Sequence, residues 1–168
     1  MTLLRLEGPG PSVAARAAAL KAELSAFCAI DERHGEDSAR LWRAVRDVAL
    51  FAAPAERAVW RVSVPPASGA AVAAEVTRQL DSRHFFDWGG GLVWLAVKGG
   101  DDGGAAIIRG AIAASGGHAT LIRAPDALRT IVPIFEPQAS ALAALTARVK
   151  ESFDPRRILN RGRMYPDL

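Results

Sequence analysis

Seven residues that begin one strand decide the fold of this chain: Ala58-Val59-Trp60-Arg61-Val62-Ser63-Val64. Apolar and polar side chains largely alternate along this stretch, a pattern with the two-residue period of a β-strand. The strand is expected to stop at Pro65-Pro66, because proline cannot donate a hydrogen bond to a sheet. The chain therefore builds at least part of its core from a β-sheet.

The residues that follow alternate between helix and strand patterns. A helix is expected at 70–80, strands at 84–88 and 92–97, a helix at 105–115 and a strand at 118–123. The order from 60 to 123 is then β-α-β-β-α-β, the order of a split β-α-β arrangement. This predicts an α+β fold with a ferredoxin-like antiparallel sheet and both helices on one face, so the other face needs a cover or a partner.

Helices are expected on both sides of this core. A short strand at 3–6 precedes a helix that Ser12 caps and that runs toward Cys28, and a second helix starts at Asp37 or Ser38 and ends at Pro54. After the core, a helical turn at 126–129 and an extended stretch at 132–137 lead to a final helix at about 140–152. Its apolar face, expected to point inward, consists of Leu142, Leu145 and Val149.

Length and composition favour an ordinary soluble protein. At 168 residues, with 50% apolar and 23% charged residues, the chain is expected to form a single domain over 1–168. The net charge of +3 is too small to indicate nucleic acid, and no apolar stretch is long enough for a transmembrane segment. Cys28 excludes an internal disulfide because it has no partner cysteine, and it is interpreted as a small buried residue.

Two glycine-rich segments could bring backbone or side chains close to a ligand. Gly89-Gly90-Gly91 predicts either a hairpin turn between two central strands or a close backbone approach to a cofactor, substrate or partner. His118 follows Gly116-Gly117, where it could act as a general base or bond to a loop carbonyl. Neither segment has the spacing of a Rossmann or phosphate-binding loop.

Other polar residues leave alternatives open. Arg61 and Arg123 lie on expected strands, and would need acidic partners or an anionic ligand if they faced inward. The histidines are too far apart for a metal site. The four tryptophans are interpreted as packing in the core or on the sheet: Trp42, Trp60, Trp88 and Trp94. The clustered tail arginines either bind an anion or line a solvated turn: Arg156, Arg157, Arg161 and Arg163.

The tail carries the most specific motif in the chain. The residues from 153 to 163 read Phe-Asp-Pro-Arg-Arg-Ile-Leu-Asn-Arg-Gly-Arg. This stretch resembles the C-terminal signature F-D-P-x-x-[IL]-[LF]-N-P-G-[KR] of flavin oxidoreductases of the vanillyl-alcohol oxidase type. Arg161 stands where that family has proline.

Three further stretches narrow the resemblance to the C-terminal, cap half of the FAD-binding subunit of bacterial glycolate oxidase. They are residues 4–8, residues 60–66, and the pair formed by 87–94 with 117–124. The resemblance implies a cap or substrate-type domain whose tail, 153–168, returns to a flavin domain absent from this chain. It also implies FAD held mainly by that N-terminal flavin domain, so that the chain alone binds FAD weakly or not at all and is inactive.

The implied activity is the FAD-dependent oxidation of glycolate, or a similar small 2-hydroxy acid, to the 2-oxo acid. The implied partners are the N-terminal flavin domain and other glycolate oxidase subunits, including a flavin subunit and an iron–sulfur subunit. The implied location is cytoplasmic, or peripheral at the inner membrane through the complex. The alternative function is a non-catalytic α+β module that binds a protein partner through its open sheet face.

The resemblance also assigns roles to individual residues. Asn160, with Arg163 and Tyr165 near it, is expected to bind the flavin cofactor. His118 and Arg61 are expected on the substrate side, because a hydroxy acid needs a base for its hydroxyl proton and a cation for its carboxylate.

Overall fold

The structure, a computed structural model, describes residues 1–53, 56–166 and 168. The chain divides into two compact units, 1–47 and 48–168, and each is described by itself. The expectation of one cap-type domain over 1–168, with a tail at 153–168 that returns to a flavin domain, stays a prediction.

The first unit contains two helices without a fully buried residue, α1 (Gly10–Leu24) and α2 (Gly35–Arg46). Proline stands in the first turn of α1, where its missing N–H costs nothing, so the helix begins before Ser12 and the predicted cap is wrong. The predicted strand at 3–6 is also wrong, because this stretch has no partner strand in the described residues. Cys28 is exposed rather than buried, since α1 ends at Leu24 and Cys28 lies beyond it.

The end of α2 differs from the prediction that it continues to Pro54. The helix stops at Arg46, and Val48 adopts a left-handed backbone with φ of 52° before a 3-10 turn, η1 (Ala49–Phe51). A β-branched residue rarely takes this conformation, and a left-handed residue cannot continue an α-helix. The turn brings Phe51 to the sheet of the second unit, where it is buried.

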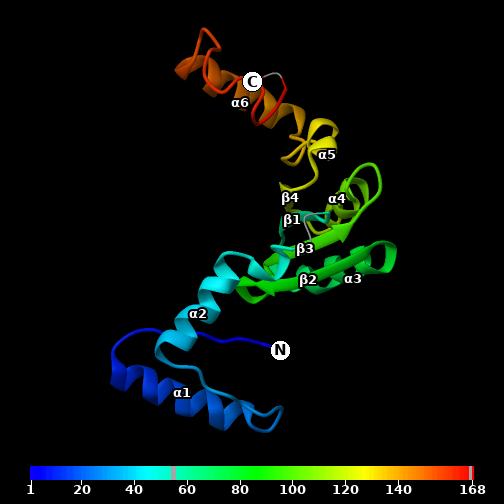
Figure 1. The fold of residues 1–168 in the computed structure, drawn as a ribbon. Coiled ribbons are helices and arrows are strands. Elements are labelled where there is room, and N and C mark those ends of the chain that lie inside the picture. The colour runs from blue at the N-terminus through cyan, green and yellow to red at the C-terminus, as the bar shows by residue number, and fades with distance from the viewer. Residues whose placement is uncertain (54–55, 167) are drawn as a thin grey trace. The chain divides into compact units, whose positions relative to one another are not determined.

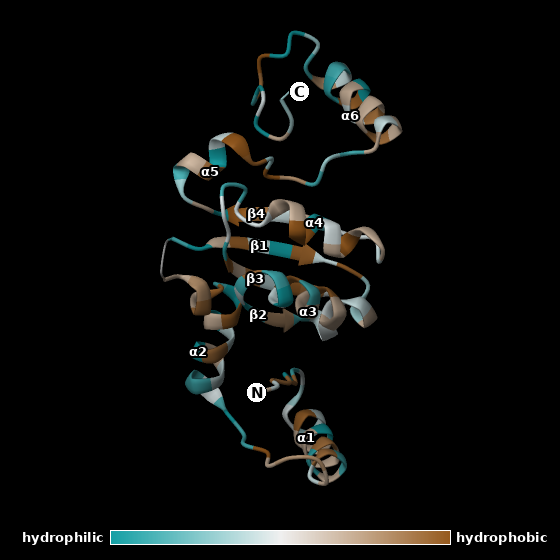
Figure 2. Cartoon of the chain, turned by 90° about the vertical axis from the view of Figure 1, so that its right-hand side faces the viewer, coloured by the Kyte–Doolittle hydropathy of each residue, from teal (hydrophilic) through white to brown (hydrophobic). Residues whose placement is uncertain are grey.

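The second unit is built on a four-stranded antiparallel sheet. Its strands are β1 (Ala58–Ser63), β2 (Asp81–Asp87), β3 (Leu92–Lys98) and β4 (His118–Arg123), in the order β2-β3-β1-β4. Two helices, α3 (Gly69–Gln79) and α4 (Ala105–Ala113), cover one face (Figure 1 and Figure 2). The predicted α+β class is confirmed, and the strand order is compatible with a ferredoxin-like arrangement.

The main core lies between the sheet and the two helices. Every second residue of β1 and β3 points into it, and Trp60, Val62 and Leu95 are fully buried there against Val76 and Ile108 of the helices. The indole Nε1 of Trp60 donates a 2.9 Å hydrogen bond to the Gly103 carbonyl. This large ring therefore fills the core while its polar N–H keeps a hydrogen-bond partner.

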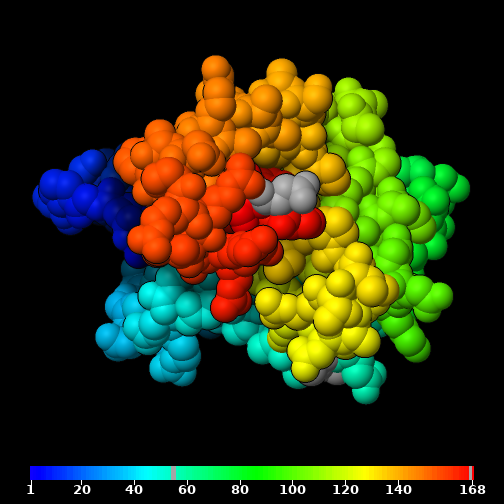
Figure 3. Space-filling view, turned by 90° about the horizontal axis from the view of Figure 1, so that it is seen from above, coloured from blue at the N-terminus to red at the C-terminus, as the bar shows by residue number. Residues whose placement is uncertain are grey.

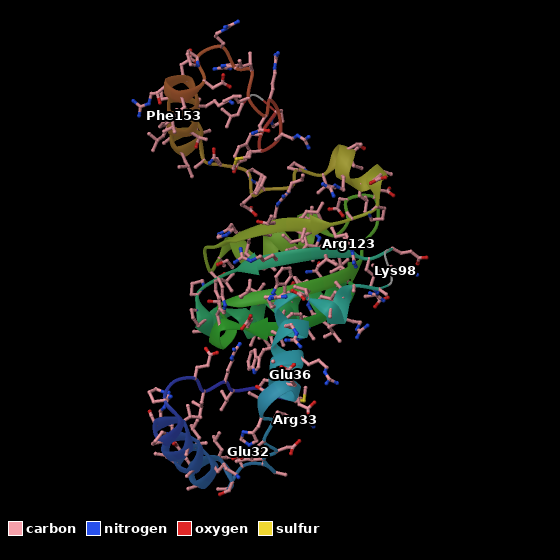
Figure 4. All side chains as sticks on the ribbon, turned by 60° about the vertical axis from the view of Figure 1, so that its left-hand side comes forward. Glu32, Arg33, Glu36, Lys98, Arg123 and Phe153 are labelled. Carbon is pink, nitrogen blue, oxygen red and sulfur yellow. The ribbon has the colours of Figure 1, made fainter. Side chains whose placement is uncertain are left out.

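The second face of the sheet is covered only in part. Phe51 packs with Val59 and Ala96 there, and the partly buried rings of Phe85 and Trp94 stack beside them at 6.3 Å. Arg123, labelled in Figure 4, donates hydrogen bonds to the Phe51 and Ala52 carbonyls, the latter at 2.8 Å. The rest of this face has no covering element in the described part of the second unit.

The two sheet edges differ. The outer side of β4 is bonded by the segment before α6: the Leu121 amide donates to the Ile134 carbonyl at 2.8 Å, and the Ala119 amide donates to Glu136 Oε2 at 3.1 Å. β2 pairs with β3 alone among the described strands. The hairpin at Gly89-Gly90-Gly91 therefore joins one central strand to an edge strand, not two central strands.

The glycines of this hairpin lie close to the backbone of the segment from Pro66 to Gly69, not to a ligand. A Cβ on Gly90 would lie 2.8 Å from the Pro66 carbonyl oxygen, and one on Gly69 would lie 2.0 Å from the Gly90 carbonyl oxygen. The turns η2 (Pro66–Ser68) and η3 (Trp88–Gly90) thus pack backbone against backbone. The prediction of a hairpin turn here is confirmed, although the turn joins an edge strand to a central strand.

The C-terminal part consists of α5 (Asp126–Ile131), α6 (Ser140–Phe153) and the tail from 154. The inward face predicted for α6 is wrong: Leu142, Leu145 and Val149 are 50%, 48% and 50% exposed. Figure 3 shows α6 in orange beside the red tail, and Phe153 lies at the helix end in Figure 4. No helix within the described residues is long and apolar enough to cross a membrane.

The net charge of the chain also gathers here. Residues 140–168 contain six Lys and Arg and three Asp and Glu, which equals the whole net charge of +3, so residues 1–139 are neutral overall. The tail arginines are exposed.

Candidate functional site

The uncovered part of the second sheet face brings two of the predicted site residues together. In the pairing of β1 with β4, Arg61 lies opposite Thr120 and Ser63 lies opposite His118. Because Val62 and Ala119 point into the core, these four residues share the opposite face. Arg61 and His118 are diagonal neighbours, roughly 7–8 Å apart between backbones.

Arg61 lies on an aromatic platform. Its guanidinium carbon is 5.5 Å from the centre of the Trp88 ring, and Trp94 of β3 lies opposite it in the sheet. Arg61 makes no hydrogen bond or ion pair to a side chain or carbonyl in the described residues. A planar cation held by a ring keeps its donors available for a carboxylate, which it can bind with two parallel hydrogen bonds.

Trp88 does not lie in the core. It is 66% exposed, at the end of the β2–β3 hairpin, with φ of 52°. The prediction that the tryptophans pack in the core or on the sheet holds for Trp60 and Trp94, which are buried and partly buried. The exposed ring of Trp88 leaves Arg61 accessible from the solvent side.

His118 is exposed at the first position of β4. Gly117, just before it, has φ of +130°, and a Cβ there would lie 2.3 Å from the Ser63 carbonyl oxygen. Only glycine allows this contact, so the start of β4 is held tightly against the end of β1. The His118 ring makes no hydrogen bond within the described part of the chain, so the loop-carbonyl partner considered for it is not found there.

Arg123 has a different role from the one considered for it. Its guanidinium bonds carbonyls at 51 and 52 and so fixes the segment that covers part of the sheet. It therefore satisfies backbone acceptors and does not join Arg61 and His118.

The tail is shaped by one buried acid. Asp154 is 5% exposed, and its carboxylate accepts the Ile158 amide at 3.0 Å and the Leu159 amide at 2.9 Å. Lys150 donates to the same carboxylate at 2.7 Å and to the Leu159 carbonyl at 2.6 Å. The Lys150 hydrogen bond, with those of the Leu159 and Ile158 amides, lowers the pKa of Asp154 from 3.8 to about 2.

Asn160 comes directly after this arrangement of Lys150, Asp154 and the amides of residues 158 and 159, called the Asp154 clamp below. It has φ of 46°, a left-handed conformation that asparagine tolerates well, and its carbonyl accepts the Arg163 amide at 3.2 Å. The Asn160 side chain is exposed and makes no hydrogen bond in the described residues. Arg163 is exposed as well, so both side chains are presented outward by a loop of fixed backbone.

Tyr165 connects the tail to the sheet. Its hydroxyl donates to the Glu136 carbonyl at 3.3 Å, and its ring lies 6.2 Å from that of Phe135. The Glu136 carboxylate accepts the Ala119 amide and lies 3.5 Å from Arg109. The tail is thus joined through Glu136 to the residue that follows His118.

Sequence reasoning missed several residues that this arrangement uses. Glu136 and Arg109 gave no signal, because their contacts depend on the path of the chain after β4. Asp154 stood inside the quoted tail motif, and an acid just after a helix and before free amides could have been read as a loop cap.

The side chains of the tail are suited to contact one edge of a flavin ring but not to enclose it. The Asn160 amide and the Arg163 guanidinium supply donors that suit the carbonyl and nitrogen edge of a flavin ring. An open groove of about 450 Å³ in the second unit lies away from the tail, between α3 and β2, and includes Ala74, His84 and Phe86. The described residues contain no cluster of three or more His, Cys, Asp or Glu placed to hold a metal ion.

Comparison with known proteins agrees with this organisation. Residues 136–164 match the family described as FAD linked oxidases, C-terminal domain, a span that begins at Glu136 and contains the clamp and Asn160. The chain is 31% identical over 167 residues, 98% of its length, to "Glycolate oxidase subunit GlcE" of Escherichia coli (strain K12). It spans 39% of the length of that relative. No solved structure matches the chain significantly.

The two matches cover the motifs on which the resemblance was based. The family match contains the whole tail signature at 153–163, and the match to the relative covers almost the whole chain, including β1, the glycine hairpin and β4. The resemblance is therefore confirmed: the tail is similar to the C-terminal domain of FAD linked oxidases, and almost the whole chain is similar to part of a glycolate oxidase subunit.

Proposed function

We propose that this chain forms the substrate-facing part of an enzyme that oxidises glycolate, or a similar small 2-hydroxy acid, to the 2-oxo acid. The observation that carries the proposal is the β1–β4 register, which puts Arg61 and His118 on one open face as diagonal neighbours. A 2-hydroxy acid has its carboxylate and hydroxyl on adjacent carbons, so a cation and a base at this spacing can hold both groups.

Each residue has one role in this proposal. Arg61, on the ring of Trp88, binds the carboxylate of the substrate. His118 accepts the hydroxyl proton at a ring nitrogen, which is available because the ring has no partner in the described residues. Ser63 and Thr120, on the same face, supply further hydroxyl groups for orientation.

FAD, when bound, supplies the two-electron acceptor for this oxidation. We propose that most FAD contacts come from a flavin-binding domain outside these 168 residues, and that the chain contributes Asn160 and Arg163 at one edge of the ring. Tyr165 acts as a positioning residue, because its hydroxyl is already engaged by the Glu136 carbonyl. The chain alone is then expected to retain little or no flavin.

The proposed partners follow from the same assignment. They are the N-terminal flavin domain, a second flavin subunit and an iron–sulfur subunit, which would carry electrons onward in a cytoplasmic complex that can lie at the inner membrane. The name of the relative, a glycolate oxidase subunit, supports membership of an assembly. The exposed apolar face of α6 and the exposed tail arginines are suited to such contacts.

The test is a co-expression experiment. The chain is produced together with a flavin-binding domain of the proposed kind, the complex is purified, and its visible spectrum is recorded before and after glycolate is added without oxygen. Bleaching of the flavin band by glycolate supports the proposal. A flavin-loaded complex that no 2-hydroxy acid bleaches contradicts it.

Variants separate the two substrate roles. His118→Gln is expected to slow bleaching at least about 100-fold with little change in substrate affinity, because it removes a base. Arg61→Gln is expected to raise the substrate concentration for half-maximal bleaching about tenfold or more. The matched control is Ile122→Ala, an exposed residue further along β4, which should leave both quantities unchanged.

The alternative is a non-catalytic module that binds a protein through the open sheet face. Exposed apolar side chains on and beside that face, Trp88 at 66% and Ile122 at 47%, favour it. Under this alternative Trp88→Ala weakens assembly, whereas His118→Gln leaves the activity of the assembled complex intact.

A further inference from the structure

The β2 edge of the sheet has no partner strand on its outer side in the described residues of the second unit. β2 is seven residues long and contains no proline, glycine or lysine, the residues that commonly block an edge. The opposite edge, β4, is covered by the segment that holds Ile134 and Glu136. Within the described residues of the second unit, one edge is therefore bonded by another segment, whereas the β2 edge, visible beside β3 in Figure 2, has no strand on its outer side.

The sequence of β2 is complementary to itself in one antiparallel register. When two copies are aligned on a two-fold axis at Phe85, Arg83 of each copy faces Asp87 of the other, and His84 faces Phe86. Phe85 then faces its own copy, so an aromatic pair is flanked by two opposite-charge pairs. Cross-strand pairs of both kinds stabilise antiparallel sheets.

Neighbouring registers lack this match. An axis at His84 places Asp81 opposite Asp87 and so opposes like charges, which destabilises a strand pair. An axis at Phe86 sets Asp87 against Phe85 and leaves Arg83 without an acid. The charges therefore select one register, as register is selected in natural sheets.

The side chains that this register uses are available. Arg83 is exposed and forms no ion pair in the described residues, and Asp87 uses one oxygen for the Trp88 amide at 2.8 Å. Phe86 is 43% exposed and borders the open groove of about 450 Å³ between α3 and β2. The small residues Ala70 and Ala74 line the same groove, which leaves room for an aromatic ring from a second copy.

We infer that the β2 edge is a self-association surface, on which a second copy of this chain pairs antiparallel through residues 83–87. The two sheets become one continuous eight-stranded sheet across a two-fold axis. The inference does not rest on the proposed oxidation: the edge lies two strands away from β1, which carries Arg61.

The test uses charge exchange on the full chain. Sedimentation velocity over a range of concentrations is expected to show a monomer–dimer equilibrium. Arg83→Asp and Asp87→Arg should each weaken the dimer by about tenfold or more, because each turns two attractive pairs into two repulsive ones. Arg129→Asp, an equal charge change on an exposed residue of α5, is the control and should leave the dimer unchanged.

Mixing the two variants shows whether a loss of dimer in each variant comes from the changed charges or from misfolding. A chain with Asp at 83 and a chain with Arg at 87 match each other at both positions, so the 1:1 mixture should dimerise although each variant alone does not. A wild-type chain that stays monomeric at every concentration, variants that dimerise like the wild type, or a mixture that stays monomeric would each overturn the inference.

Discussion

Asp154 shows how a single residue can shape the tail that carries the family motif. Its carboxylate binds the amides of residues 158 and 159 and the ammonium of Lys150, and Asn160 follows directly. Three donors converge on one buried acid, so its charge is strongly favoured in the folded chain. The orientation of the Asn160 side chain is therefore set by a residue that does not itself face outward.

Replacement of Asp154 by Asn is expected to release the tail. The amide can accept only through one oxygen and no longer pairs with Lys150, so the thermal midpoint of the second unit should fall by several degrees. Differential scanning calorimetry measures this change. Glu151→Gln, which removes an exposed acid one turn earlier in the chain, is the control and should have almost no effect; equal midpoints for the two variants would contradict the clamp.

The same carboxylate predicts how stability depends on pH. The pKa of Asp154 lies at about 2 when folded and near 3.8 in its ordinary state, so the folded chain binds this proton less readily than the unfolded chain. Its contribution is complete above pH 3.8 and is lost as the pH falls from about 4 to about 2. Denaturation at several pH values, compared between wild type and Asp154→Asn, should show a smaller loss for the variant over this interval.

At the scale of elements, the close contact of β1 with β4 depends on one glycine. Gly117 has φ of +130°, and a Cβ at this position would lie 2.3 Å from the Ser63 carbonyl oxygen. This close contact sets where β4 begins, at His118. An alanine here would meet the backbone oxygen and a disfavoured backbone angle at once.

Gly117→Ala is therefore expected to destabilise the second unit by about 2–3 kcal/mol. Gly110→Ala is the matched control: Gly110 lies inside α4 with open space around it, so alanine should stabilise by about 0.5–1 kcal/mol. Urea denaturation gives both free energies. The account of Gly117 fails if both alanines change stability in the same direction.

The elements also show what sequence patterns could and could not predict. Alternation in 58–64 and helical spacing in 70–80 located β1 and α3 closely, because both segments bury one face in their own unit. The spacing in 140–152 located α6 equally well, but not the exposure of its apolar face. Periodicity tells which residues share a face and says nothing about what covers that face.

The candidate site needed more than local patterns. Whether Arg61 and His118 share a face depends on the register of two strands far apart in sequence, and this pairing shifts between Val59 and Trp60. One irregularity of this kind moves side chains relative to their cross-strand neighbours. The sequence could identify the two residues as candidates, but only the sheet brings them together.

At the scale of the whole molecule, charge is distributed unevenly along the chain. Residues 1–139 are neutral overall, whereas α6 and the tail carry the entire excess of positive charge. Such a distribution attracts acidic partners to one segment without a general affinity for anions.

The rate at which the chain associates with the proposed flavin domain should therefore depend on salt. Stopped-flow measurements are expected to show association slowing about tenfold between 20 and 500 mM salt, on the scale set by charge screening. A variant with Arg156, Arg157 and Arg161 changed to Gln should associate slowly at all salt concentrations. Salt-independent association of the wild type would show that the tail does not guide the encounter.

The exposed tail has a further consequence for how assembly can be followed. Trypsin-like proteases cut accessible backbone after arginine, and four arginines lie between positions 156 and 163. Contact of the tail with the proposed flavin domain would cover these bonds, whereas they are accessible in the chain by itself. Resistance to brief trypsin digestion is therefore expected to report the fraction of chains that have assembled.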